Sequence, residues 1–165
     1  MVSARAKRGP ARARFLAGAK SAEVVIKTFR NSYFPFVAEE IKEYVETLKH
    51  EVSPDVIFTH YHEDYHQDHR LISQLTWNAF RSHQILEYEV PKYDGDLGRP
   101  NIFSRLDEAI CRRKIDIIMQ CFESQRHKQW FDPEVFRAVL RLRGMESDST
   151  TRYAEAFYGR KVALG

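Results

Sequence analysis

Apolar residues along the chain follow two patterns, one typical of buried strands and one typical of amphipathic helices. Val24-Val25-Ile26 is a β-branched run without alternation, which indicates a strand buried on both faces, and Val56-Ile57-Phe58 is an apolar run that indicates a short buried strand. Elsewhere apolar residues recur every three or four positions, which indicates helices with one buried stripe. The pattern predicts the tail of a helix at residues 10–19, strands at 22–29, 54–59, 84–90 and 102–106, a last strand or edge segment within 153–162, and helices at 36–49, 69–82, 107–124 and 132–144.

Strands that alternate with helices define the expected fold class. We expect an α/β protein with a Rossmann-like three-layer fold and a mostly parallel sheet. The sequence contains neither G-x-G-x-x-G nor a Walker-type lysine motif, so it has no glycine-rich phosphate loop. The fold class alone therefore does not imply a bound nucleotide.

Basic residues are concentrated at the start of the chain. Residues 1–20 hold six Lys or Arg and no acidic residue. Such a segment can be an arm for nucleic acid. We favour a solvated terminus, because no aromatic residue that could stack on bases lies among these charges before Phe15. The expected organisation is a basic segment at residues 1–20 and one domain at residues 21–165, with no nucleic-acid partner.

Length and composition favour one globular domain inside the cell. A chain of 165 residues is large enough to bury a core, and no apolar run approaches the ~20 residues that a membrane helix needs. The first residues contain no apolar signal-peptide region. Cys111 and Cys121 lie on one predicted helix at about 15 Å along its axis, too far apart to form a disulfide with each other. We expect a cytoplasmic protein with reduced thiols and no membrane span.

Candidate chemistry is concentrated between His60 and His69, a segment with four of the seven histidines and three acidic residues. It joins the carboxyl end of a predicted strand to the start of a predicted helix, where open α/β sheets place ligands. Imidazole and carboxylate are the usual ligands of zinc and similar ions. One loop could wrap His60, His62, Asp64 and His66 around a metal, although surface or loop-packing roles are the more common ones for His60 and His62.

The order Asp64-x-His66-x-Asp68-His69, placed after an apolar strand, resembles the PIG-L/LmbE family of zinc-dependent N-deacetylases. The resemblance continues in Arg143-Gly144 and in Tyr153-Ala154-Glu155-Ala156-Phe157, and it covers roughly residues 20–163. Members of that family hydrolyse the acetamide of N-acetylglucosamine-type sugars. The resemblance therefore implies a hydrolase that acts on an N-acetylated sugar or glycoconjugate.

The resemblance also implies roles for individual residues. His69 would be a ligand of Zn²⁺ or another divalent metal, and His66 would donate a hydrogen bond to the oxyanion of the tetrahedral intermediate. Asp68 would orient a histidine of the motif by accepting a hydrogen bond from its second ring nitrogen. Asp64 and Arg143 would bind the substrate, and Arg143 is also a candidate for pairing with a carboxylate.

One family motif is missing from the sequence. Members open with a strand that ends in His-Pro-Asp-Asp-Glu, which supplies two further zinc ligands and the aspartate general base. The sequence contains no such motif, so we expect an N-terminally truncated fold that lacks the first β-α-β unit. One motif histidine cannot hold catalytic zinc, which needs three protein ligands and an open position. The alternative is a catalytically inactive member that acts as a sugar-binding or oligomer-partner protein, and a bared sheet edge would favour a homo-oligomer.

Overall fold

The computed structural model describes residues 24–162 of the chain. The basic segment predicted at residues 1–20, with the helix tail predicted inside it, lies outside the described residues. No helix within residues 24–162 combines the length and the apolar character needed to cross a bilayer. The elements are, in order, η1 (Phe34–Val37), α2 (Ala38–Glu51), β1 (Val56–His60), α3 (Gln67–Ala79), β2 (Gln84–Tyr88), β3 (Ile102–Leu106), α4 (Glu108–Cys121), η2 (Glu123–Gln125), α5 (Pro133–Glu146) and β4 (Tyr153–Tyr158).

The strands of the described residues form one sheet in the order β1-β2-β4-β3. β1 pairs with β2 in parallel, in a register that runs from Val56 opposite Gln84 to His60 opposite Tyr88. β4 runs antiparallel to both of its neighbours. Three strands thus point one way and β4 the other, so the α/β class is confirmed and the sheet is mostly, but not wholly, parallel.

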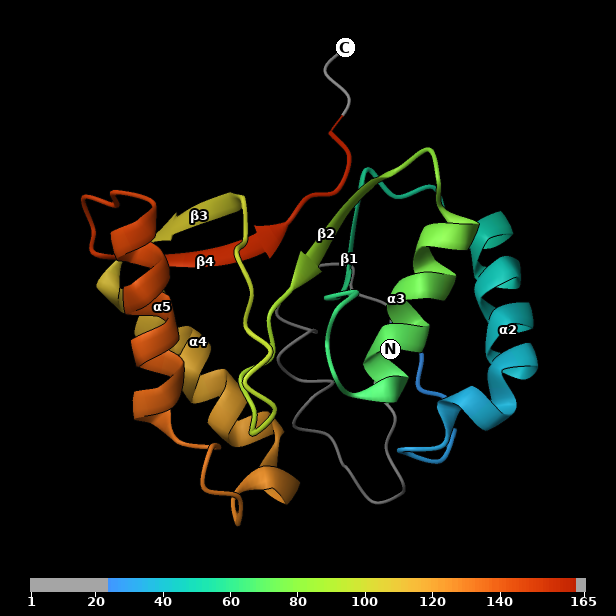
Figure 1. The fold of residues 1–165 in the computed structure, drawn as a ribbon, viewed down its shortest axis with the longest axis horizontal. Coiled ribbons are helices and arrows are strands. Elements are labelled where there is room, and N and C mark those ends of the chain that lie inside the picture. Colours follow the sequence, from blue (N-terminus) through green and yellow to red (C-terminus); the bar gives the residue numbers. More distant parts are fainter. Residues whose placement is uncertain (1–23, 163–165) are drawn as a thin grey trace.

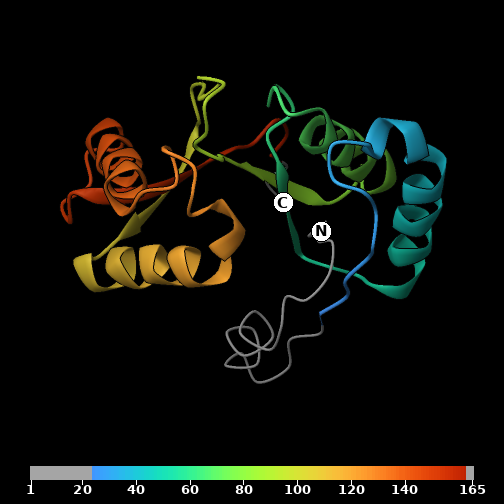
Figure 2. The same ribbon diagram turned by 90° about the horizontal axis from the view of Figure 1, so that it is seen from below.

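The helices pack as two pairs, one towards each end of the sheet (Figures 1 and 2). α2 and α3 lie beside β1 and β2, around a core that includes the fully buried Ile41 and Ile85. α4 and α5 lie beside β3 and β4, around a second core that includes Cys111 and Leu140. A pairing of two residues on each strand joins β2 to β4, and with it the two halves. The polar loop after β1 lies close to this junction.

The strand predicted at residues 22–29 is absent from the described part of that segment. Residues 24–30 have no regular structure, and Val24, Val25 and Ile26 are 40%, 49% and 53% exposed. The run has the β-branched composition of a strand, but no strand among the described residues pairs with it, and strand preference depends on such a partner. β1 is consequently an edge strand within residues 24–162.

The other predicted elements are present with boundaries shifted by a few residues. Two of these shifts matter for the site. β1 extends to His60, and α3 begins at Gln67 with His66 as its N-cap residue. His60 and His69 therefore stand on regular elements, and the loop between them is residues 61–66.

Candidate metal centre

The loop between β1 and α3 is fixed by the buried side chain of Asp64. One carboxylate oxygen accepts a hydrogen bond from the backbone N–H of His66 at 2.7 Å. The other lies 2.8 Å from Nδ1 of His69. Lys92, from the loop after β2, brings its Nζ to 3.1 Å from Asp64. A short acidic side chain that accepts from the backbone two residues on is a common way to fix a tight turn, and here it also aims an imidazole.

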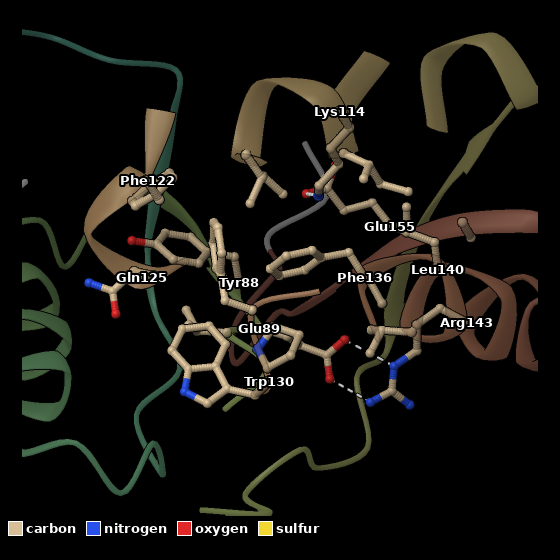
Figure 3. Close-up of a pocket in the computed structure, with 18 residues that line it drawn as sticks. Tyr88, Glu89, Lys114, Phe122, Gln125, Trp130, Phe136, Leu140, Arg143 and Glu155 are labelled. Atoms are coloured by element: carbon tan, nitrogen blue, oxygen red, sulfur yellow. Dashed lines mark hydrogen bonds and ion pairs between the residues drawn. The ribbon is translucent and has the colours of Figure 1, made fainter. Parts of the chain in front are cut away.

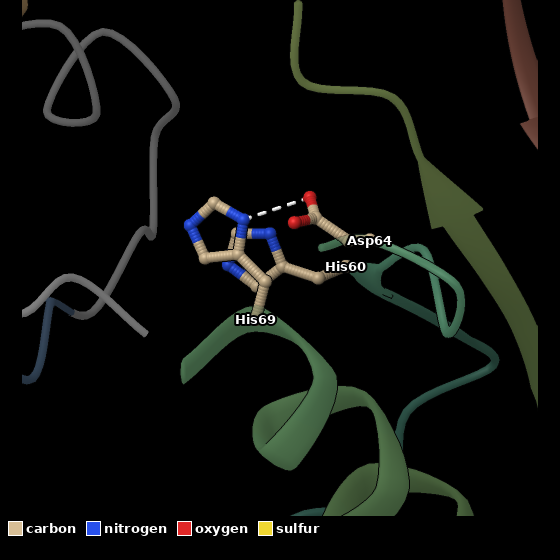
Figure 4. A group of neighbouring side chains, drawn as sticks. All are labelled: His60, Asp64 and His69. Atoms are coloured by element: carbon tan, nitrogen blue, oxygen red, sulfur yellow. Dashed lines mark hydrogen bonds and ion pairs between the residues drawn. The ribbon is translucent and has the colours of Figure 1, made fainter. Parts of the chain in front are cut away.

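His60, Asp64 and His69 form a group of potential metal ligands in the described part of the chain. One ligand atom from each lies within 4.8 Å of the other two. Figure 4 shows both imidazoles beside the carboxylate, with His69 on the first turn of α3. The two rings stack with centroids 3.9 Å apart and planes 6° apart. Ligand atoms that share one zinc ion at bond lengths of about 2.0–2.2 Å lie up to about 4 Å apart, which is close to this spacing.

His60 is in the form that binds a metal. Burial, followed by the electrostatic interaction with His69, lowers the pKa of His60 to about 2, so the ring is neutral. Its Nε2 lies 3.2 Å from the hydroxyl of Tyr88. Its Nδ1 is buried and has no hydrogen-bond partner among residues 24–162. An N–H at Nε2 that donates to Tyr88 leaves a lone pair on this orphaned Nδ1, and a cation would satisfy it.

Asp64 remains ionised although it is 2% exposed. Burial acts to raise its pKa, but the hydrogen bond and charge of His69, the backbone N–H of His66 and the charge of Lys92 together lower the pKa to about 2. The ionised carboxylate can both accept from His69 and contribute negative charge to a cation site. Two imidazoles and one carboxylate are a donor set that suits zinc, so the residues present fit a divalent metal.

His66 lies directly beside the ligand group. Its ring stacks on that of His69 with centroids 4.5 Å apart. Burial, followed by the charge of His69, lowers the pKa of His66, which favours the neutral imidazole. Its Nδ1 is buried and unpartnered within the described residues. The predicted role of His66 as a hydrogen-bond donor is compatible with this position and stays a prediction.

Asp68 makes different contacts from those expected of it. Its carboxylate is 3% exposed and accepts hydrogen bonds from the backbone N–H groups of Ser32, at 2.5 Å, and Phe34, at 3.1 Å. The contact with a motif histidine that was predicted for Asp68 is made by Asp64 instead, on His69. The reason is geometric: Asp68 lies in the first turn of α3, on the side that faces η1, so it anchors the segment before α2.

Glu87 of β2 holds the loop between β1 and α3 in place, although the sequence pattern did not single it out. It is fully buried in β2, and its carboxylate accepts from the backbone N–H of His62 at 3.0 Å and lies 2.6 Å from Nδ1 of the same residue. Trp77 and Arg160 donate to it at 2.6 and 2.7 Å. Burial acts to raise the pKa of Glu87, but these hydrogen bonds, led by those of His62, lower it. A single acidic residue inside the apolar strand Ile85-Leu86-Glu87 was the signal that could have identified it.

Arg143 pairs with a carboxylate, as predicted, and the partner is Glu89. Its Nε and Nη2 lie 2.9 and 2.5 Å from the two carboxylate oxygens of Glu89 (Figure 3). Nη1 lies 2.7 Å from Glu146. The guanidinium is 3% exposed and links the end of β2 to α5. Since these donors are engaged within the protein, contact between Arg143 and substrate stays a prediction.

The structure thus brings His60, Asp64, His66 and His69 together and leaves Asp68 and Arg143 outside the group. His69 was predicted as a ligand. Asp64 was expected to bind substrate but lies among the ligands, and its contact with substrate stays a prediction. His60 was expected to be a surface or loop-packing residue, but it lies at the end of β1 and its ring stacks on that of His69.

Comparisons with known proteins find a similar family and similar folds. The family model described as PIG-L: GlcNAc-PI de-N-acetylase matches residues 4–80, a stretch that contains the whole ligand group. No curated protein sequence matches the chain. Among solved structures, N,N'-diacetylchitobiose deacetylase from Pyrococcus horikoshii shares 18% identity at a TM-score of 0.57, covering 79% of this chain and 54% of its own.

Two further solved structures have the same fold. The conserved protein TT1542 from Thermus thermophilus shares 18% identity at a TM-score of 0.57, over 84% of this chain and 65% of its own. The A40926 pseudoaglycone deacetylase Dbv21 shares 19% identity at a TM-score of 0.55, over 98% of this chain and 83% of its own. At these sequence identities the similarity shows the fold alone. The chain spans 54% of the length of the first protein and 65% of the length of the second. The sequence match over residues 4–80 and the shared fold together support a PIG-L/LmbE-like deacetylase family for this chain.

Proposed function

We propose that the chain carries a metal-dependent amide hydrolase site that removes the acetyl group from an N-acetylated sugar, with Zn²⁺ as the metal. The observation that supports this most is the group of two imidazoles and one ionised carboxylate, His60, Asp64 and His69, at the carboxyl end of β1. The names of two structurally similar proteins, deacetylases of N,N'-diacetylchitobiose and of A40926 pseudoaglycone, suggest the reaction.

The residues around the group would each position a reacting part. His60, Asp64 and His69 would hold a divalent cation, which when bound would supply Lewis acidity for the amide carbonyl and lower the pKa of a water molecule. Asp64 accepts the Nδ1–H of His69 and so fixes the tautomer and orientation of that ring. His66, neutral and next to His69, donates an N–H to the carbonyl oxygen as negative charge develops there. A donor placed in this way typically lowers the barrier by about 3 kcal/mol.

A second candidate is a non-catalytic protein that binds a sugar or serves as an oligomer partner. The observation that favours it is the state of Asp64, whose carboxylate is already engaged with His69 and Lys92 and is therefore not free to act as a general base.

Metal analysis of the purified chain tests the site itself. We expect about one equivalent of zinc in the wild type and less than about a tenth in His69→Ala, because catalytic and structural zinc sites need at least three protein ligands. His127→Ala removes an exposed histidine far along the sequence and should leave the stoichiometry unchanged. A wild type with under a tenth of an equivalent would refute the metal site.

Release of acetate from an N-acetylglucosamine disaccharide separates the two candidates. If the chain is the enzyme, His66→Gln should lower turnover by about 10²–10³-fold while the zinc content stays at the wild-type value. If the wild type binds zinc and the disaccharide but releases no acetate, the non-catalytic candidate is correct. Retention of full turnover by His66→Gln would refute the role given to that histidine.

A further inference from the structure

An apolar cavity of about 280 Å³ lies between α4, α5 and the strands β2 and β4 (Figure 3). Ile118 of α4 and Val139 of α5 form two of its walls, and Phe136 and Trp130 contribute aromatic surface. Tyr88 lines it on the side of β2. The volume is near the lower end of the range for small-molecule sites, which is about 300–1,000 Å³.

The charged side chains that line this cavity are already paired with one another. Glu89 pairs with Arg143, and Lys114 pairs with Glu155. Each charge thus has its counter-charge within the protein, so the cavity has little free charge to offer an ionic ligand. Its lining therefore favours an uncharged hydrocarbon or aromatic group over a charged one.

The cavity adjoins the candidate metal centre. Tyr88 lines the cavity, and its hydroxyl lies 3.2 Å from Nε2 of His60. Glu89 and Val90, the next two residues, line both this cavity and a small pocket that also contains Asp64. A ligand whose amide lies at the metal centre therefore has an apolar space next to it.

We propose that this cavity binds a hydrocarbon group that the substrate carries close to its amide. The substrate class is then an amphiphilic N-acylated amino sugar, whose hydrocarbon is either the acyl chain or the group on the anomeric oxygen. The position of the amide rests on the proposed function, whereas binding of the hydrocarbon to the cavity does not.

The first test is calorimetric titration of the full chain, without added metal, with octyl β-glucoside below its micellar concentration. This probe has a hydrocarbon chain and no amide. We expect saturable binding with a negative heat-capacity change, the mark of apolar burial. Each methylene added between hexyl and octyl glucoside should tighten binding roughly fourfold, the equivalent of about 0.8 kcal/mol per buried methylene.

Two variants that fill the cavity locate the binding. Val139→Phe and Ile118→Phe should each weaken octyl glucoside binding about tenfold or more, because the added ring occupies the space. Leu142→Phe enlarges a side chain of the same helix that is 42% exposed and does not line the cavity, so it should bind as the wild type does. Folded filling variants that bind as tightly as the wild type would overturn the proposal. If they do not fold, the wild-type series decides: an affinity that does not change from hexyl to octyl glucoside overturns it.

The two sources of the hydrocarbon are separated by a second titration series. N-octanoylglucosamine carries the chain on the amide, and octyl N-acetylglucosaminide carries it on the anomeric oxygen. Whichever binds more tightly than N-acetylglucosamine, and loses this advantage in Val139→Phe, identifies the source. If neither does, the proposal fails. A chain that binds octyl glucoside but no zinc would refute the proposed function and leave the cavity assignment standing.

Discussion

Single buried carboxylates organise the region around the candidate metal centre. Asp64, Asp68 and Glu87 are each at most 3% exposed, and each carboxylate accepts hydrogen bonds from different groups. Asp64 contacts an imidazole, Asp68 accepts from two backbone N–H groups, and Glu87 accepts from the backbone of the loop between β1 and α3. A buried carboxylate that loses its donors is costly, because its charge is no longer compensated. A single substitution of Glu87 or Asp68 should therefore have a measurable and distinct effect.

Glu87→Gln should lower the free energy of unfolding by about 2–4 kcal/mol. The amide loses the charge and turns an N–H₂ towards the donors His62, Trp77 and Arg160. Chemical denaturation at neutral pH measures this, and Glu43→Gln, an exposed position of α2, should change it little. A loss no larger than that of Glu43→Gln would contradict the place given to Glu87.

The same carboxylate gives the protein a defined acid sensitivity. The pKa of Glu87 is lower in the folded chain than its ordinary value of 4.5, so its contribution to stability is present above that value. The contribution is lost as the pH falls from 4.5 towards the lowered folded pKa. The wild type should therefore lose more stability than Glu87→Gln over this acid range, as measured by thermal melting at a series of pH values. Parallel acid profiles for the two proteins would argue against the lowered pKa.

Asp68→Ala separates an anchoring role from a role in the chemistry. Removing its carboxylate leaves the backbone N–H groups of Ser32 and Phe34 without their acceptor, which should lower the free energy of unfolding by about 1–3 kcal/mol. Zinc content should be unchanged, because Asp68 is not one of the grouped ligands. Asp116→Ala, at an exposed position of α4, is the control for stability. Loss of zinc in folded Asp68→Ala would show that Asp68 contributes to the metal site.

Among the helices and strands, α5 and the turn before β4 pack against each other without room for a side chain at Gly144. A Cβ placed on Gly144 would overlap the carbonyl oxygen of Arg152 and lie 2.7 Å from Cα of Tyr153. These are backbone atoms, so the contact cannot be relieved by rotating a side chain. Glycine thus lets α5 approach β4, and this approach also sets the place of Arg143 at the end of the helix.

Gly144→Ala should destabilise the protein, although glycine is normally the worse residue inside a helix. Helix propensity alone predicts a gain of about 1 kcal/mol from this change. The overlap with Arg152 should reverse the sign and cost about 1–3 kcal/mol, the usual cost of overpacking. Thermal unfolding of the variant beside the wild type shows which effect wins. A raised melting temperature would mean that α5 and the turn can separate without cost.

The sequence predicted most helices and strands because local features specify them. The start of α5 is an example: Asp132 accepts from the backbone N–H of Glu134, and Pro133 is the first helical residue, a combination typical of a helix start. The strand predicted for the run Val24-Val25-Ile26 was wrong because no local feature decides whether a partner strand is present. The run shows a preference for extended backbone, but the partner strand that would make it a strand is a property of the whole sheet.

The candidate site was predictable in place but not in its internal contacts. The cluster of histidines after an apolar strand identified the loop and His69. Which carboxylate meets which imidazole depends on the turn at Asp64 and on the direction in which α3 leaves it, and neither is set by composition. Glu87 reaches His62 only because β1 and β2 pair in parallel, a contact between residues 25 apart in sequence.

Over the whole molecule, the two halves share one sheet whose β1 edge is unpaired within residues 24–162. Phe58, in the middle of β1, is 58% exposed, and Val56 is 37% exposed. An unpaired strand edge with exposed apolar side chains can pair with another chain. The same edge ends at His60, so whatever covers β1 also borders the candidate metal centre.

We therefore expect the chain to self-associate through β1. Phe58→Lys places a charge on the edge strand, a common device against strand pairing, and should shift the protein towards monomer in sedimentation velocity at micromolar concentration. Phe36→Lys changes another exposed phenylalanine, 77% exposed in η1 and away from the edge, and should leave the assembly state of the wild type unchanged. Equal effects of both changes would indicate nonspecific apolar association. A wild type that sediments as a single monomer would show that the β1 edge needs no partner chain, and the metal centre would then have to be complete within one copy.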